Sequence, residues 1–179
     1  MFSDYQANRP RSESHVLTQQ ILAHKEAVRF PDEWVQSIRS YLTHWVASEG
    51  PLRYLVVTVV PKKPNGVPRM ESLLVQLALT VEVNPITDLR CTFEPELMAF
   101  SEGVVSARRS HLKAEQRFQN VETHLRVVDP MAVLGYPVLV IDDVVTTGAS
   151  LICASKKLKA IGAGQAIKCL ALAKAVSDK

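Results

Sequence analysis

The fold of this chain follows from residues 138–150, which read Val-Leu-Val-Ile-Asp-Asp-Val-Val-Thr-Thr-Gly-Ala-Ser. The stretch begins with four apolar residues, three of them β-branched, a pattern typical of a strand buried on both faces. The residues from Ala149 to Leu158 favour a helix. The sequence therefore predicts two carboxylates and a hydroxyl-rich turn at the point where a strand passes into a helix.

A phosphate group is the ligand that this turn suits best. The N-terminus of a helix leaves its first backbone N–H groups unpaired and carries partial positive charge, so an anion there meets several donors at once. Thr146, Thr147 and Ser150 add hydroxyl donors. Gly148 lacks the side chain that would keep the backbone away from the phosphate oxygens.

The two carboxylates need a different partner. Asp142 and Asp143 would repel a phosphate, whereas the hydroxyl groups of an attached sugar donate hydrogen bonds to carboxylates. The competing interpretation is that Asp143 orders the turn and the threonines cap the helix. Capping needs one such residue, not five, so we favour a site for a phosphorylated sugar.

The segment from Asp142 to Ser150 resembles the phosphoribosyl pyrophosphate (PRPP) motif of type I phosphoribosyltransferases, and it matches that motif at every position. The chain has neither the Gly-Lys-Ser/Thr ending of a P-loop nor the Gly-x-Gly-x-x-Gly of a dinucleotide fold. The resemblance implies that Asp142 and Asp143 hold the ribose hydroxyls. It implies that the ribose 5-phosphate is bound by Val145, Thr146, Thr147, Gly148, Ala149 and Ser150.

Length and composition restrict the class of protein. With 179 residues and 47% apolar content, the chain suits one domain, for which we expect residues 15–179, preceded by a flexible arm over residues 1–14. The net charge of +3 is too mild to indicate nucleic-acid binding by itself. The three cysteines form no zinc or disulfide pattern, and Cys153 and Cys169 are expected in the core. Without a signal core or a membrane-spanning stretch, the cytoplasm is the expected compartment.

Apolar periodicity predicts helices that alternate with strands. Helices are expected over residues 15–29, 31–50, 71–81 and 149–161, and strands over 52–60, 89–93, 124–128, 138–141 and 166–176. The polar, basic segment 101–120 is predicted to be a mobile loop. Trp34 and Trp45 are expected to pack in the core. The alternation favours an α/β fold with a doubly wound, mainly parallel sheet and N-terminal helices, which is the fold of type I phosphoribosyltransferases.

The loop over residues 61–69 should lie beside the motif, because ligands gather at the carboxyl ends of strands in open α/β sheets. Its cations are Lys62, Lys63 and Arg69, and they suit either a bound pyrophosphate or a solvated basic turn. On the first interpretation, the pyrophosphate is bound by Pro61, Lys62 and Lys63.

The flanking segments are similar to those of ComF-type competence proteins. Such proteins usually carry an N-terminal zinc ribbon, which this chain lacks, and Arg69-Met70-Glu71-Ser72 replaces their arginine-glycine-phenylalanine-asparagine stretch. The resemblance rests on the order and spacing of Val59-Val60-Pro61, Arg69, Gln76, Ala78, Arg117-Phe118-Gln119-Asn120-Val121 and Leu170-Ala171-Leu172-Ala173-Lys174.

The wider resemblance implies a transferase, in which a nitrogen nucleophile displaces pyrophosphate from C1 of PRPP through an oxocarbenium-like state. Catalysis would then be mainly electrostatic, with Asp142 and Asp143 beside the ring and with Arg108, Arg109 and Lys113 closing over the leaving group. Mg²⁺ would arrive bound to the pyrophosphate.

Two alternatives to a transferase stay open, because nothing in the sequence identifies the molecule that would accept the phosphoribosyl group. One is a protein that senses PRPP or a nucleotide without catalysis. The other is an accessory protein of DNA uptake or processing, which would bind single-stranded DNA through the basic segment from Arg108 to Arg117. A homodimer is compatible with each of these functions.

Overall fold

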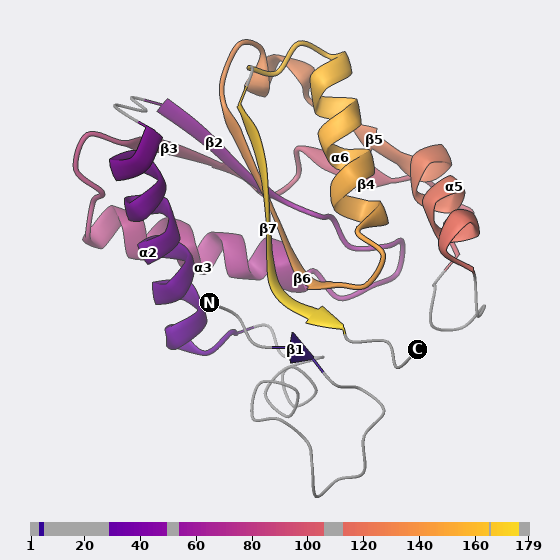
Figure 1. Cartoon of the computed structure of the whole chain (residues 1–179), viewed down its shortest axis with the longest axis horizontal. Helices are drawn as coiled ribbons and strands as arrows, with labels where there is room; N and C mark the ends of the chain where they lie inside the picture. Colours follow the sequence, from indigo (N-terminus) through magenta and orange to yellow (C-terminus); the bar gives the residue numbers. More distant parts are fainter. Residues whose placement is uncertain (1–3, 6–28, 50–53, 106–112, 165, 176–179) are drawn as a thin grey trace, which may run out of the picture.

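A computed structural model describes residues 4–5, 29–49, 54–105, 113–164 and 166–175 of the chain. Its centre is a parallel five-stranded sheet in the order β1-β7-β6-β2-β3, which confirms the predicted α/β class (Figure 1). The strands are β1 (Asp4–Tyr5), β2 (Tyr54–Val59), β3 (Arg90–Glu94), β6 (Val138–Val145) and β7 (Ile167–Ala175). The described helices are α2 (Asp32–Glu49), α3 (Arg69–Val83), α5 (Ala114–His124) and α6 (Ala149–Ala160), with a short 3-10 helix over Pro130–Val133.

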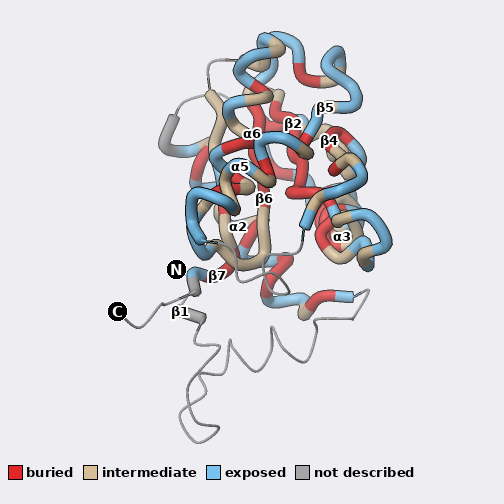
Figure 2. Tube along the Cα trace, turned by 90° about the vertical axis from the view of Figure 1, so that its right-hand side faces the viewer, coloured by how far each residue is buried: buried red, intermediate tan, exposed pale blue. Residues whose placement is uncertain are grey.

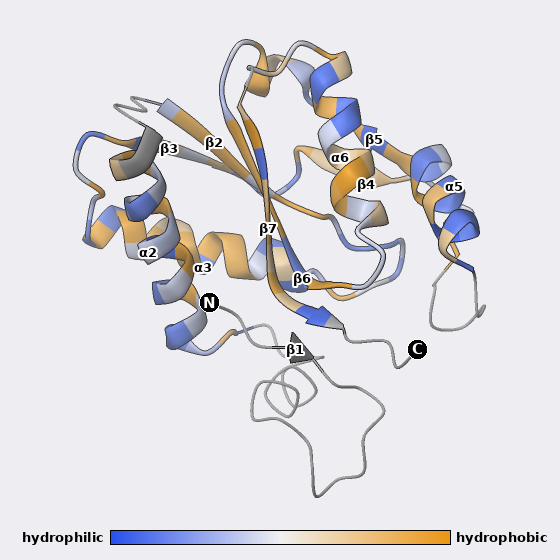
Figure 3. Cartoon of the chain, in the orientation of Figure 1, coloured by the Kyte–Doolittle hydropathy of each residue, from blue (hydrophilic) through white to orange (hydrophobic). Residues whose placement is uncertain are grey.

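Helices cover both faces of the sheet. Alternate residues of a strand point to opposite sides, and in β6 the residues on both sides are apolar and must be buried. Leu139 and Ile141 of β6 belong to the core that α2 and α3 share with the sheet. Val138 and Val140 belong to the second core, with α5 and α6. Figure 2 shows the buried residues concentrated between these layers, and Figure 3 shows the apolar strands at the centre of the molecule.

Trp34 and Trp45 are 6% and 2% exposed, so their predicted packing in the core is confirmed. The predicted helix 15–29 lies outside the described residues except for Arg29. Within the predicted arm, residues 1–14, the structure describes Asp4 and Tyr5, which pair with β7.

The prediction of a mobile loop over 101–120 is wrong from Ala114 onward, because α5 occupies this part of the segment. Its apolar anchors are few but suitably spaced: Val121 is buried, and Phe118 packs against the core beneath α6. The predicted strand near residue 125 is present as β5 (Leu125–Val127). It pairs antiparallel with β4 (Met98–Phe100), which is too short to give a periodic signal, and these two strands form a separate sheet.

The predicted core thiols divide between two environments. Cys153 is buried, as expected, whereas Cys169 is exposed. The strand β7 is apolar on average, and the sequence pattern does not reveal that Cys169 lies on its accessible side.

Candidate functional site at the end of β6

The strand order reverses between β2 and β6. From β2 the chain passes through α3 to β3 on one side, and from β6 it passes through α6 to β7 on the other. Such a switch point leaves a crevice at the carboxyl ends of the two strands, where ligands bind in open α/β sheets. Loop 61–68 and the turn over residues 146–148 leave the sheet at this crevice, as the sequence predicts.

Among the described residues, the last part of β6 has a neighbouring strand on one side only. Pairing with β2 ends at Val59 and Ile141, whereas pairing with β7 continues to Val145 and Lys174. β6 therefore extends past the point where β2 turns away into loop 61–68. Asp142 and Asp143 lie on this extension.

The turn before α6 contains a glycine in a left-handed backbone conformation. Gly148 has φ of 75°, a left-handed value that residues with a Cβ adopt only under strain. Its carbonyl accepts the first helical hydrogen bond, from Ile152 N at 2.9 Å. Thr147 Oγ1 accepts a long hydrogen bond of 3.4 Å from Ala149 N. The N–H groups of the first turn of α6 thus border the crevice.

A small hollow with a cavity volume of about 90 Å³ opens at this turn. The motif residues and two other elements form its walls. They are Lys63 of the loop after β2, Arg117, Asn120 and Val121 of α5, and Asp142, Val144, Val145, Thr146, Thr147, Gly148, Ala149 and Ser150. The structure thus brings the complete set of predicted phosphate-binding residues together at one place.

The two aspartates face different surroundings. Asp142 lines the hollow, where burial and, to a smaller extent, the Asp143 carboxylate raise the pKa of its carboxyl group. Asp143 points toward α3, where its Oδ2 accepts a hydrogen bond of 3.0 Å from Nη1 of Arg69. Arg69 was expected among the cations of the pyrophosphate loop, but in the structure its charge is paired with a motif aspartate.

Of the predicted pyrophosphate residues, Lys63 alone lines the hollow. Its Nζ donates a hydrogen bond of 2.8 Å to the carbonyl of Val105, and burial lowers the pKa of its ammonium group. Lys62 is exposed, and its backbone N–H donates to Oε1 of Glu71 at 2.7 Å. Pro61 is buried at the root of the loop.

In the described part of the chain, none of the cations predicted to close over the leaving group lines the hollow. Lys113 precedes α5, is exposed, and donates its backbone N–H to Oε1 of Gln116 at 3.0 Å. It lines neither the hollow nor the larger groove described below. Arg108 and Arg109 lie outside the described residues, so their role stays a prediction.

Two wall residues, Arg117 and Asn120, were not among the residues predicted to bind PRPP. Arg117 Nη1 lies 3.4 Å from Thr146 Oγ1. Asn120 Oδ1 accepts a hydrogen bond from the N–H of Val105, and Asn120 Nδ2 donates one to the carbonyl of Val105, each at 3.0 Å. Their spacing of three residues places them on one face of a helix and could have signalled a shared role, had the segment been recognised as helical.

We expect Arg117→Ala to weaken the binding of a phosphorylated ligand, because a charged donor at the wall would be lost. A hydrogen bond to a charged group contributes about 1.5 to 3 kcal/mol, which corresponds to a loss of affinity of roughly tenfold or more. Calorimetric titration with ribose 5-phosphate measures this change. Arg126→Ala is the matched control, because Arg126 is an exposed arginine that lines the groove and not the hollow. Equal affinities of the two variants would remove Arg117 from the site.

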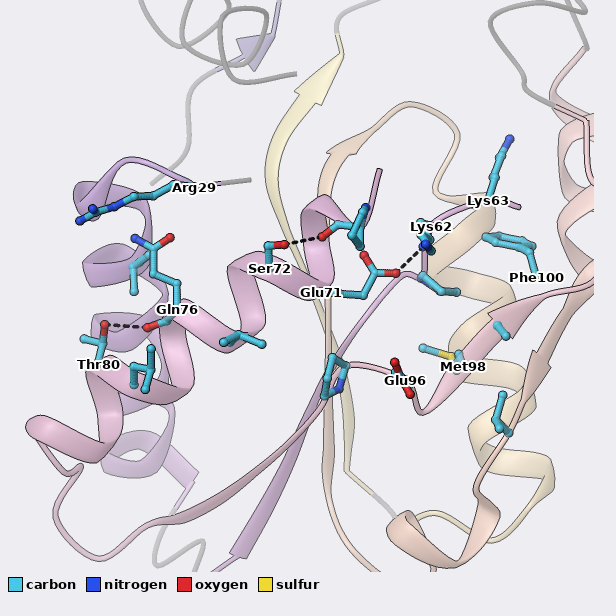
Figure 4. A pocket seen from close by; sticks show the side chains of 18 of the residues that line it. Arg29, Lys62, Lys63, Glu71, Ser72, Gln76, Thr80, Glu96, Met98 and Phe100 are labelled. Atoms are coloured by element: carbon cyan, nitrogen blue, oxygen red, sulfur yellow. Dashed lines mark hydrogen bonds between the residues drawn. The ribbon is translucent and has the colours of Figure 1, made fainter. Parts of the chain in front are cut away.

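A much larger groove, with a cavity volume of about 1750 Å³, runs along α3. Figure 4 shows Ser72, Gln76 and Thr80 on α3, with Met98 and Phe100 on the opposite side and Lys62 and Lys63 at one end. This volume exceeds that of ordinary small-molecule pockets. Exposed apolar residues of α3, namely Val75, Leu79 and Val83, contribute to its lining. We assign the ligand site to the smaller hollow because helix N–H groups, hydroxyls and cations converge there.

Among the described residues, no three His, Cys, Asp or Glu side chains come together as a group that could hold a metal ion. No described helix has the length and apolar character needed to cross a membrane.

The solved structures similar to this chain include several phosphoribosyltransferases. Hypoxanthine-guanine phosphoribosyltransferase from Schistosoma mansoni is 13% identical, with a TM-score of 0.46, and the match covers 84% of this chain and 62% of that one. Hypoxanthine phosphoribosyltransferase from Trypanosoma cruzi is 12% identical, with a TM-score of 0.45, and the match covers 79% of this chain and 66% of that one. A hypoxanthine-guanine phosphoribosyltransferase from Bacillus anthracis is 13% identical, with a TM-score of 0.43 and coverage of 83% and 74%.

This chain thus spans less than two thirds of the length of the first two of these structures. No protein-family model and no curated protein sequence matches it. Because the identities and TM-scores mark a distant likeness, the site assignment rests on the chain's own residues.

Proposed function

We propose that this chain is a phosphoribosyltransferase-like protein that binds PRPP at the end of β6 and transfers its phosphoribosyl group to a nitrogen acceptor, with release of pyrophosphate. The observation that carries the proposal is the hollow between α6 and α5, where the whole segment from Val145 to Ser150 and Asp142 meet Lys63. The order of the flanking segments supports a ComF-like member of this class.

The hollow suits the 5-phosphate end of the ligand. The N–H groups of the first turn of α6 and the hydroxyl groups of Thr146, Thr147 and Ser150 supply donors on one side. Arg117 supplies a guanidinium on the other. A cavity volume of about 90 Å³ admits a phosphate group but not a whole PRPP molecule. The ribose would therefore extend from the hollow along the open side of β6.

The ribose would lie beside Asp142, which can accept hydrogen bonds from its hydroxyl groups. A carboxylate in this position also opposes the positive charge that develops on the sugar ring as the bond from C1 to pyrophosphate breaks. Lys63 follows the neighbouring strand and would neutralise the departing pyrophosphate. The chain thus contributes charges of opposite sign to the two ends of the breaking bond, which is the arrangement that stabilises such a transition state.

The donor set fits a magnesium ion that is carried by the ligand. Asp142 and Asp143 are the carboxylates at the strand end, and Asp143 is engaged by Arg69. Mg²⁺ commonly binds through one or two carboxylates together with substrate phosphates and water, so the pyrophosphate oxygens would supply most of its ligands. When bound, the ion would neutralise charge on the leaving group.

A pyrophosphate-release assay tests the proposal. Wild-type protein is incubated with PRPP, Mg²⁺ and a panel of bases, amines and nucleosides, and we expect at least one acceptor to stimulate release. Lys63→Ala should lower this rate strongly, because Lys63 lines the hollow. Lys62→Ala is the matched control and should lower it less, because Lys62 lines only the groove. Tight PRPP binding without release for any acceptor would contradict transfer and favour a sensor.

A further inference from the structure

Two adjacent carboxylates at a sugar-binding site suggest a shared task, but the structure places them in different contacts. The Asp143 carboxylate has both oxygens engaged by the protein. Oδ1 accepts the N–H of Val144 at 2.6 Å, and Oδ2 accepts Nη1 of Arg69 at 3.0 Å. Asp142 accepts the N–H of Asp143 through Oδ1 at 2.9 Å, and it lines the hollow, whereas Asp143 does not.

The ion pair of Asp143 is shielded from solvent. The side chains of Arg69 and Asp143 are 14% and 27% exposed. The Nε and Nη2 atoms of Arg69 are buried and have no hydrogen-bond partner among the described residues, while the guanidinium lies 5.4 Å from the centre of the Phe30 ring. Asp143 is therefore the main compensation for a buried positive charge, and withdrawing it to bind a sugar hydroxyl would leave that charge uncompensated.

Arg69 also connects the strand end to the pyrophosphate loop. It is the first residue of α3, and two residues later Glu71 accepts the N–H of Lys62 at 2.7 Å. The first turn of α3 thus holds the loop through Glu71 and holds β6 through Arg69. A change at either contact would alter the position of loop 61–68 relative to the hollow.

We propose that the two aspartates have separate tasks: Asp142 alone contacts the sugar of the ligand, whereas Asp143 is an anchor through which Arg69, a positioning residue, fixes α3 and loop 61–68 to the end of β6. This inference rests on the proposed PRPP site and deepens it. It assigns the recognition of the ribose hydroxyls to one carboxylate and the geometry of the pyrophosphate loop to the other.

The electrostatic surroundings agree with this division. Burial and the nearby Asp143 carboxylate raise the pKa of Asp142. A carboxyl group whose pKa is higher in the folded than in the unfolded protein lowers folding stability as pH rises through these two values. Asp142→Asn should therefore leave the ligand-free protein at least as stable as the wild type at neutral pH. Asp143→Asn should destabilise it, because Arg69 loses its counter-charge.

The first test compares Asp142→Asn with Asp143→Asn in calorimetric titrations with ribose 5-phosphate. We expect Asp142→Asn to lower the affinity roughly tenfold or more without lowering the melting temperature. Asp143→Asn should lower the melting temperature and change this affinity by less than about threefold. Equal losses of affinity in two folded variants would overturn the division of tasks. Absence of binding by the wild type would instead refute the proposed site, and this inference with it.

The second test needs no ribose ligand. A double-mutant cycle measures whether Arg69→Met and Asp143→Asn are coupled in thermal unfolding, and the pair Arg69→Met and Asp142→Asn serves as its control. We expect coupling in the first pair only. Arg69→Met should also weaken the binding of free pyrophosphate more than that of ribose 5-phosphate, and Arg69→Lys should restore it in part. Additive unfolding effects in the first pair, or equal weakening of both ligands, would contradict the anchor.

Discussion

Gly148→Val should abolish detectable PRPP binding. Gly148 has φ of 75°, which places a β-branched residue in a conformation that it adopts only as an outlier. An added Cβ would have space, since its nearest neighbour would be the Cδ1 atom of Ile152 at 3.5 Å, so the backbone conformation is the constraint. The turn would relax toward negative φ and withdraw the N–H groups of Ala149 and Ser150 from the phosphate. Losing two charge-assisted hydrogen bonds costs about 3 kcal/mol or more, which is over a hundredfold in affinity as measured by calorimetry.

Gly135→Val separates this effect from a general loss of stability. Gly135 has φ of 78°, and an added Cβ would have no atom within 4 Å, but this glycine lies in the turn before β6 and does not line the hollow. The two variants should therefore lose similar stability, about 1 to 2 kcal/mol or more, while only Gly148→Val loses the ligand. Loss of PRPP binding in both variants would show that backbone strain anywhere near β6 is sufficient to abolish binding, and would contradict the specific role of Gly148.

The largest loss of stability is expected for Leu139→Ala. Leu139 is fully buried near the start of β6, within the core that α2 and α3 share with the sheet. Truncating such a leucine leaves a cavity and costs about 2 to 5 kcal/mol. For a chain of this length, each kcal/mol lowers the melting temperature by roughly 2 to 4 °C, which differential scanning calorimetry measures.

Leu79→Ala is the matched control for this prediction. Leu79 is 58% exposed on α3, so the same truncation should change the free energy of unfolding by less than about 0.5 kcal/mol. A comparable loss in both variants would mean that the exposed side of α3 is covered in solution, and the groove along α3 would then be an interface.

The motif was predictable because three independent signals coincide within a few residues. The apolar run from Val138 to Ile141 identifies a buried strand, Gly148 identifies the turn, and the helix from Ala149 follows directly. Each signal is local, so none depends on knowing the rest of the fold. The alternation of helices with strands favours a doubly wound sheet, and the reversal of strand order in the structure leaves loop 61–68 and the motif at the same crevice.

The tertiary contacts of the site could not be predicted in the same way. Arg69 pairs with Asp143 across 74 residues of sequence, and nothing in either local pattern indicates that one motif carboxylate is occupied by the protein itself. Arg117 and Asn120 could not be predicted as wall residues of the hollow, because a polar segment with few apolar residues is typical of a loop. The helix there depends on packing of Phe118 and Val121 against the second core, which a sequence pattern does not reveal.

The most direct test of the PRPP site is a set of three calorimetric titrations of the wild-type chain in the presence of Mg²⁺. The ligands are PRPP, ribose 5-phosphate and pyrophosphate. We predict saturable binding of PRPP that is tighter than that of either fragment, because the turn at Gly148 and Lys63, which borders both the hollow and the groove along α3, would bind different phosphate groups of one ligand. No saturable binding of PRPP, or PRPP binding no tighter than that of free pyrophosphate, would contradict the assignment of a phosphoribosyl site to the end of β6.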